Sequence, residues 1–364
     1  MKRIALSLVL LSTTPVLAAE PHVAERARKD YKSLQQTAQG LTDPQIRAAT
    51  VDALSPNTCL RHRAGLTAEG KAVIVTRLAA RGFVADTGPQ TTSGVFPSVI
   101  ADGSACPTLA QPFVAAPGGP LHSHHGWPGG LPEHERFNQR SGAALSALYS
   151  ESAGLPVDAS LVSAATLWHD WAKALVFQWQ ADGTTLPELR IGGANGTGAH
   201  HVLGLSESMA RKLSPRLVIT QACAHTAPVG DGAAKVATWL EAAAIIARVD
   251  PVKAGYLREG PNGLEINWGN GASGETGVWR ECFIHNESDA GYIHSGAAEK
   301  TADTVLERLA PRFGYDPKVS GYLMKFRHVV LAELGADRIQ AFVSAGDEAA
   351  LVKAIEALKT KGLL

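Results

Sequence analysis

The residues best able to do chemistry are His169 and Asp170, which stand side by side in an apolar stretch. Between Leu161 and Phe177 nearly every other residue is apolar or small, and this pattern predicts a buried helix. Burying a carboxylate beside an imidazole is costly unless a compensating group is present. Neutral imidazole and ionised carboxylate are natural ligands of divalent cations, so the pair predicts a metal site.

A third ionisable residue, Lys173, follows in the same apolar stretch. It comes four residues after His169, so the two side chains would share one face of a continuous helix. We therefore expect the Lys173 ammonium to face the site of Asp170. There it could meet an anionic oxygen of a substrate.

Further residues of metal-binding type occur where neighbouring helices are expected to begin or end. The chain has 13 histidines, and one segment reads His-His-Gly-Trp-Pro-Gly-Gly-Leu-Pro-Glu-His. In chain order the candidates are His124, His125, His134, His200, His201, His225 and Asp250. A single histidine is more often structural than a ligand, so the order and spacing of the set carry the interpretation.

This order resembles the HD superfamily of metal-dependent phosphohydrolases. That superfamily is all-helical and carries His…His-Asp…Asp, with two more histidines in its two-metal members. The segment from His169 to Lys173 is similar to its central His-Asp-x-Gly-Lys motif, with alanine in place of glycine. The segment from His124 to His134 resembles the His-His-x-x-x-Gly-Gly-Leu-x-x-His opening of a 3′–5′ exoribonuclease branch and of some relaxase-associated proteins. The resemblance covers residues 120–255.

The resemblance implies two divalent metal ions, bridged by Asp170. The ions are Mn, Fe, Mg, Zn or Ni, and the sequence does not choose among them. The implied ligands are His134, His169, Asp170, His201, His225 and Asp250. Lys173 would neutralise charge on phosphoryl oxygens. The residues assigned to the substrate are His124, His125 and His200.

Three functions fit this set of residues. The leading one is hydrolysis of a phosphomonoester or phosphodiester by a metal-activated water, with a small phosphorylated or nucleotide-like substrate. The second is a di-iron oxygenase, because inositol and phosphonate oxygenases resemble HD proteins and use the same ligand types. The third is a non-enzymatic exported domain that binds metal or a partner.

The elements that must position these residues are predicted to be helices. Proline residues separate the candidate helices of the central part, which are at 141–149, 158–180, 203–213, 215–225 and 233–249. Further helices are predicted at 297–313, 319–334 and 347–358. The fold class is therefore mainly α, an HD-type bundle with a small N-terminal cap and additional C-terminal helices. The expected parts are a cap and loop-rich segment at 20–119, the metal-binding domain at 120–255, and a loop with helices packing on it at 256–364.

The N-terminal segment and the charge composition of the chain restrict the cellular location and the binding partners of the protein. Lys2 and Arg3 precede an apolar stretch too short to span a bilayer, which predicts a signal peptide at 1–19 and an exported, periplasmic protein. The chain has 34 basic and 34 acidic residues and no basic stripe, which disfavours a nucleic-acid surface. No later stretch is expected to enter a membrane, and the oligomeric state stays open.

Four cysteines occur in the chain, and none forms a Cys-x-x-Cys pair, so a zinc–thiolate site is not expected. In an exported protein an even number permits disulfides. We expect Cys59 to pair with Cys106, since both lie in the loop-rich N-terminal part. Cys223 lies in a predicted core helix and could equally be a small buried hydrophobic residue.

Overall fold

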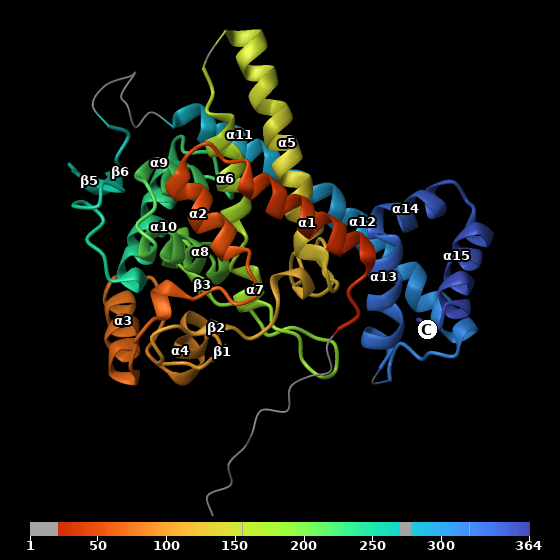
Figure 1. Cartoon of the computed structure of the whole chain (residues 1–364). Helices are drawn as coiled ribbons and strands as arrows, with labels where there is room; N and C mark the ends of the chain where they lie inside the picture. Colours follow the sequence, from red (N-terminus) through yellow and green to blue (C-terminus); the bar gives the residue numbers. More distant parts are fainter. Residues whose placement is uncertain (1–20, 155, 270–277, 320) are drawn as a thin grey trace, which may run out of the picture.

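The computed structural model describes residues 21–154, 156–269, 278–319 and 321–364, so the predicted signal peptide lies outside the described residues. These residues are mainly helical, as predicted (Figure 1). Their strands form three short antiparallel pairs, β1–β2, β3–β4 and β5–β6. Among the described residues, no helix has both the length and the apolar character needed to cross a bilayer.

The main core is built around α6 (Ala159–His169), the apolar helix of the sequence. It packs against α5 (Gly130–Ala153), α8 (Ala199–Ala210), α9 (Pro215–Ala222) and α11 (Trp279–Asp289). In the same core lies α10 (Asp231–Ala247), which packs on α8. Nearly every side chain of α6 is buried, which is why the sequence there is apolar all round.

Two N-terminal helices cover α6, namely α1 (Glu25–Gln39) and α2 (Pro44–Ala53) (Figure 1). Buried tryptophans fix this contact through their indole nitrogens. Nε1 of Trp168 donates to the Thr50 hydroxyl at 2.9 Å, and Nε1 of Trp171 donates to the Ala53 carbonyl at 2.9 Å.

The predicted continuous helix at 158–180 is wrong, because the chain turns at Asp170. Helix α6 ends at His169, and α7 (Lys173–Val176) begins after the turn. At this turn Nε2 of Gln221 donates to the Trp168 carbonyl at 3.0 Å. The lysine and His169 therefore do not share a helix face, and the turn instead presents Asp170 to several elements.

The N-terminal cap continues with α3 (Ala68–Ala80), α4 (Pro89–Val95), β1 (Val99–Ile100) and β2 (Thr108–Leu109). The predicted disulfide between Cys59 and Cys106 is confirmed. A second disulfide joins Cys223 at the end of α9 to Cys282 on α11.

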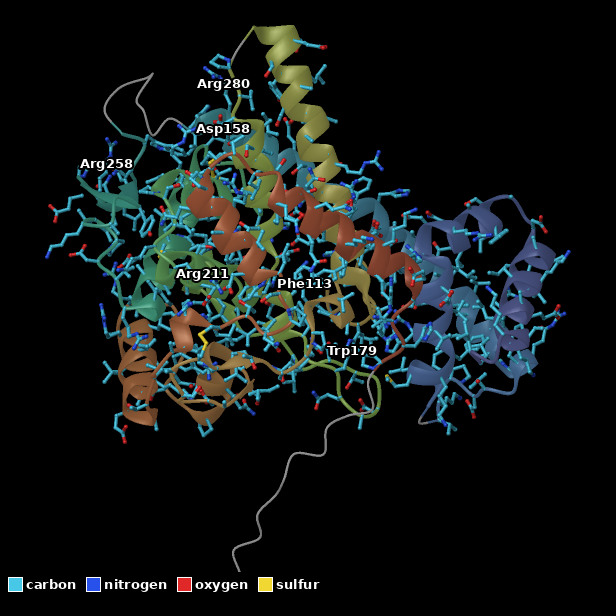
Figure 2. All side chains as sticks on the ribbon, in the orientation of Figure 1. Phe113, Asp158, Trp179, Arg211, Arg258 and Arg280 are labelled. Atoms are coloured by element: carbon cyan, nitrogen blue, oxygen red, sulfur yellow. A yellow bond between two sulfur atoms is a disulfide. The ribbon has the colours of Figure 1, made fainter. Side chains whose placement is uncertain are left out.

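A buried ionic contact ties this cap to α8. Nδ1 of His62 lies 2.6 Å from a carboxylate oxygen of Glu207, and Nε of Arg211 donates to the other oxygen at 2.7 Å. Arg211 is labelled in Figure 2. Burial alone would raise the pKa of Glu207, but the hydrogen bond and charge of His62 and the charge of Arg211 lower it to about 2.

The remaining helices form a lobe with a second hydrophobic core, drawn in blue in Figure 1. It contains α12 (Tyr292–Leu309), α13 (His328–Leu334), α14 (Ala336–Ser344) and α15 (Glu348–Thr360). The preceding α11 belongs to the main core, which includes Val278 and Cys282.

The other short elements connect these helices. The strands are β3 (Arg190–Ile191), β4 (Thr197–Gly198), β5 (Leu257–Gly260) and β6 (Gly263–Ile266). Single turns of 3₁₀ helix occur at Arg61–Arg63, Phe113–Ala115, Gly193–Asn195 and Ala310–Phe313, and a π turn occurs at Leu323–Arg327.

Candidate metal centre

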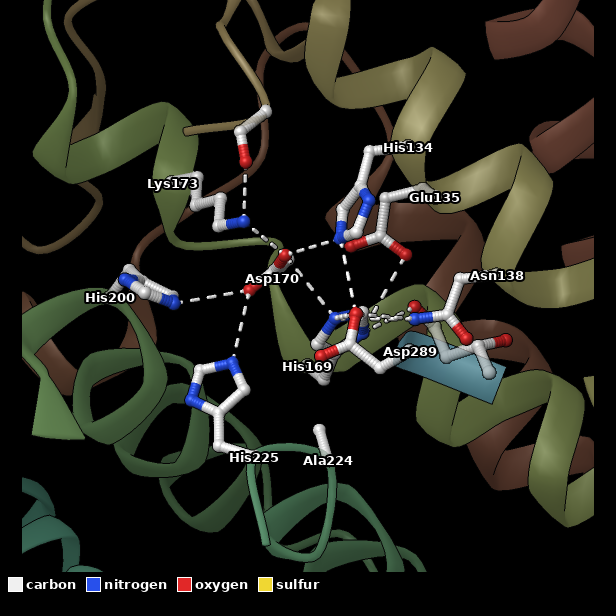
Figure 3. Close-up of polar contacts among 12 residues, drawn as sticks. His134, Glu135, Asn138, His169, Asp170, Lys173, His200, Ala224, His225 and Asp289 are labelled. Atoms are coloured by element: carbon white, nitrogen blue, oxygen red, sulfur yellow. Dashed lines mark hydrogen bonds and ion pairs between the residues drawn. The ribbon is translucent and has the colours of Figure 1, made fainter. Parts of the chain in front are cut away.

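Five elements of the main core meet at Asp170, the residue at the turn after α6 (Figure 3). Helix α5 supplies His134, α6 supplies His169, and α8 supplies His200. The loop after α9 supplies His225. The fifth element is α11, whose last residue is Asp289.

The two carboxylate oxygens of Asp170 face different sets of imidazoles. Oδ2 lies 2.9 Å from Nε2 of His134 and 3.2 Å from Nε2 of His169. Oδ1 lies 3.1 Å from Nε2 of His200 and 3.8 Å from Nε2 of His225. One buried carboxylate therefore stands between two groups of nitrogen ligands.

Two groups of side chains at this point have the types and the spacing of metal ligands. The first contains His134, His169, Asp170 and Asp289, and the second contains Asp170, His200 and His225. Within each group one ligand atom per residue lies within 4.8 Å of the others. These His/Asp groups could hold metal ions.

The hydrogen bonding of the buried polar atoms supports the fit of metal ions to these groups. Nε2 of His134, Nε2 of His200 and both oxygens of Asp170 are buried and make no hydrogen bond of acceptable geometry. Buried polar atoms are otherwise almost always hydrogen-bonded. Divalent cations would give these converging nitrogen and oxygen atoms the partners that well-formed hydrogen bonds do not provide.

Asp289 is the ligand-type residue that the sequence analysis did not identify. Its Oδ1 lies 3.3 Å from Nε2 of His134 and 3.4 Å from Nε2 of His169. No helix was predicted at 279–289. The available signal was Cys282, His285 and Asp289, whose spacing of three and four residues places them on one helix face.

Asp250, the predicted closing ligand, lies outside this cluster. It follows α10, and its side chain is 49 % exposed. Its carboxylate accepts hydrogen bonds from the backbone N–H groups of Val252 at 3.0 Å and Lys253 at 3.1 Å. An aspartate that caps a turn directly before Pro251 has a local role. Among the described residues, the carboxylate that joins Asp170 in the first ligand group is that of Asp289.

The structure also separates two adjacent histidines, with His200 at the cluster and His201 outside both ligand groups. His200, assigned from the sequence to the substrate, belongs to the second ligand group. Its Nδ1 contacts Oε1 of Glu188 at 2.5 Å, which orients the ring. His201, predicted as a ligand, is buried and points away. Its ring stacks on His225 at 4.2 Å, and its Nε2 lies 3.2 Å from the Ala222 carbonyl.

Lys173, His124 and His125 surround the first ligand group. The ammonium of Lys173 forms an ion pair with Oδ2 of Asp170 and donates to the Gly118 carbonyl (Figure 3). The ring centroids of His124 and His125 lie 4.8 and 5.3 Å from that of His134. All three residues therefore lie beside the cluster, and the lysine reaches it across the α6–α7 turn rather than along a helix face.

Charge in the cluster is balanced between carboxylates and imidazoles. Burial alone would raise the pKa of Asp170, but the charges of His169 and Lys173 lower it well below its ordinary value. Burial alone would lower the pKa of His169, and nearby carboxylates instead raise it well above. Burial likewise opposes protonation of His200, but Glu188 and Asp170 raise its pKa to about 9. Divalent cations would replace these imidazole protons, because metal-bound imidazole is neutral.

A surrounding set of buried polar residues orients the candidate ligands. Nδ2 of Asn138 donates to Oδ1 of Asp289 at 3.2 Å. Nδ1 of His285 lies 2.8 Å from the Thr220 carbonyl, and its ring contacts that of His169 edge-on at 5.1 Å. Such supporting contacts hold ligand rings in one orientation. Neither His285 nor Asn138 is among the candidate residues that the order and spacing of the sequence indicated.

The cluster opens into a cavity of about 420 Å³, a volume suited to a small ligand. Its lining includes candidate ligands as well as apolar residues. The lining residues are His124, His134, Asp170, Lys173, His200, Ala224, His225, Asn286, Glu287, Asp289, Ala290, Tyr292 and Ile293.

Comparison with known proteins does not place the chain in a family. No protein-family model, curated protein or solved structure matches it.

Proposed function

We propose that the protein is a two-metal phosphohydrolase of the HD type, acting on a small phosphomonoester or phosphodiester. The observation that carries the proposal is the position of Asp170, which offers one oxygen to each of two ligand groups. A shared carboxylate is the feature expected of a site for a pair of cations, and it supports two ions rather than one. The bundle around α6 would be the HD-type fold.

The first ion would be held by His134, His169, Asp170 and Asp289, and the second by Asp170, His200 and His225. Bound ions would supply a water activated for attack and neutralise charge on the phosphoryl group. These are nitrogen and oxygen ligands of the kind that Mn, Fe, Zn and Ni accept.

The chain's own residues would bind and orient the substrate. The ammonium of Lys173, which lines the cavity, is placed to neutralise an anionic oxygen beside Asp170. His124 lines the same cavity and is placed to hydrogen-bond a substrate oxygen. The cavity volume favours a small phosphorylated or nucleotide-like molecule over a polymer.

We further propose that the protein is exported to the periplasm. The two disulfides, Cys59–Cys106 and Cys223–Cys282, support this location, because disulfides persist in oxidising compartments.

A panel of phosphoesters tests the function. The protein is loaded with Mn²⁺ and assayed with p-nitrophenyl phosphate, bis-p-nitrophenyl phosphate and nucleoside monophosphates and cyclic nucleotides. We expect metal-dependent hydrolysis that is lost in Asp170→Ala and retained in Asp250→Ala, a matched aspartate outside the cluster. Full activity of Asp170→Ala would refute the proposal.

Two further measurements separate the alternatives. Oxygen uptake by the iron-loaded protein, absent with manganese or zinc, would indicate a di-iron oxygenase instead. Less than one metal ion per chain after loading would indicate a non-enzymatic domain.

A further inference from the structure

Three histidines form a separate convergence point beside the first ligand group. They are His124 and His125, from the loop before α5, and His134 from α5 itself. One nitrogen from each ring lies within 4.8 Å of the others. We propose that this tri-histidine group is a third cation site, selective for Zn²⁺ and similar nitrogen-binding ions.

Each of the three rings has a buried nitrogen without a well-formed hydrogen bond, although Nε2 of His134 also lies close to the carboxylates of Asp170 and Asp289. Nδ1 of His124, Nδ1 of His125 and Nε2 of His134 are buried and make no hydrogen bond. The residues His125 and His134 are almost fully inaccessible, at 5 % and 2 % exposure. An imidazole buried without a hydrogen-bond partner is costly, and a coordinated cation removes that cost.

The backbone holds His125 in a conformation that points its ring into the group. Its φ is +56°, in the left-handed region that non-glycine residues rarely adopt. The His125 carbonyl accepts hydrogen bonds from the N–H groups of Gly118 and Trp127, each at 2.9 Å. Backbone strain of this kind persists only where surrounding contacts over-determine it, and it is concentrated at functional sites.

Side chains of the C-terminal lobe form hydrogen bonds with both backbone polar groups of the next residue, Gly126. A carboxylate oxygen of Glu299 accepts from the Gly126 N–H at 2.8 Å. Nη1 of Arg327 donates to the Gly126 carbonyl at 2.9 Å. Arg327 is fully buried and forms ion pairs with Glu299 and Asp303, each at 2.7 Å. The loop that carries the two histidines is therefore fixed by charged contacts before any cation binds.

The chemistry of the three ligands sets the preference for the ion. Three imidazoles without a carboxylate suit Zn²⁺, Ni²⁺ or Cu²⁺ better than Mn²⁺ or Mg²⁺. Two nitrogen ligands of one zinc ion are about 3.3 Å apart, so modest ring rotations would close the group. The cationic side chain of Lys173, whose charge acts on His124 and His125, forms an ion pair with Asp170.

His134 belongs both to this site and to the first ligand group, and its Nε2 can bind only one ion at a time. With zinc at the tri-histidine site, the first group keeps His169, Asp170 and Asp289. Each of three zinc ions would then have three protein ligands. Manganese, which disfavours an all-nitrogen site, would occupy the two carboxylate-containing groups alone.

Equilibrium dialysis with metal analysis tests this proposal without reference to any reaction. The full-length protein is dialysed separately against Zn²⁺ and Mn²⁺, as are His124→Gln/His125→Gln and the control His294→Gln. His294 is a largely exposed histidine, with 71 % of its side chain accessible. We expect three zinc ions per chain in the wild type and in the control and two in the double variant, with two manganese ions in all three proteins.

Two results would overturn the proposal. One is an equal zinc content in the wild type and the double variant. The other is a parallel loss of zinc and manganese, which would show that the two histidines support the carboxylate-containing groups instead. If the double variant does not fold, the single variant His124→Gln, altered at the partly exposed member, is expected to lose the same one zinc ion. A wild type that binds no manganese would contradict the proposed function while leaving the zinc comparison valid.

Discussion

The substitution Asp289→Asn provides a sharp test of the metal centre, because only the structure assigns a ligand role to Asp289. Its Oδ1 lies 3.3 and 3.4 Å from the Nε2 atoms of His134 and His169, and the side chain is buried. Asparagine keeps the shape and removes the negative charge. Residues that merely support a ligand are worth 10–100-fold in metal affinity, so for a direct ligand we expect a loss of at least about 100-fold.

The same loss has a predictable effect on stability. A 100-fold change in Kd corresponds to about 2.7 kcal/mol of binding free energy. At a free metal concentration about 1,000 times the wild-type Kd, the ion adds about 4.1 kcal/mol to the free energy of unfolding of the wild type and about 1.4 kcal/mol to that of the variant.

Two assays measure these quantities. Competition with a chromophoric chelator gives the Mn²⁺ Kd, and urea unfolding with and without Mn²⁺ gives the stabilisation. The matched control is Asp250→Asn, an exposed aspartate for which we expect wild-type values. Wild-type Mn²⁺ affinity in Asp289→Asn, or an equal loss in Asp250→Asn, would refute the placement of the ligand.

Two further predictions concern the frame around the site. The pKa of Glu207 is lowered from 4.5 to about 2 in the folded protein. Ionised Glu207 therefore adds about 3 kcal/mol to the free energy of unfolding above pH 4.5, and this stabilisation is lost as the pH falls towards 2. Urea unfolding should therefore show the stability difference between wild type and Glu207→Gln shrinking by about 2 kcal/mol from pH 6 to pH 3, and a constant difference would contradict this. Replacing Cys223 and Cys282 by serine should lower the free energy of unfolding by about 2–5 kcal/mol and also weaken Mn²⁺ binding, since that disulfide anchors α11. The same change at Cys59 and Cys106 should lower stability alone, and equal Mn²⁺ affinities in the two double variants would count against the anchoring role.

The predictable part of the fold was the part with a strong apolar pattern. The stretch around His169 is buried because almost every neighbour is apolar, and α6 accordingly lies in the main core. Helix α11 was missed because its pattern is mixed. It buries Cys282, His285 and Asp289 on one face and exposes Trp279, so no clean apolar stripe marks it.

The choice between His200 and His201 could not be predicted from the sequence either. Adjacent residues on a helix point about 100° apart, so only one of them can face Asp170. Both are buried, and the sequence carries no signal that separates them. The packing of α8 against α10 and α6 decides the rotation of the helix, and this places His200 at the cluster and His201 behind it.

The sequence by itself determined that the chain is mainly helical and that an imidazole–carboxylate pair would be buried where few compensating groups are available. Apolar patterning and the cost of burying charge act locally, so both can be read along the chain. Tertiary structure alone decided which residues complete the cluster. That choice depends on helix rotation and on the packing of α11, whose Asp289 follows Asp170 by 119 residues (289 − 170), and such contacts leave no pattern in the spacing of neighbouring residues.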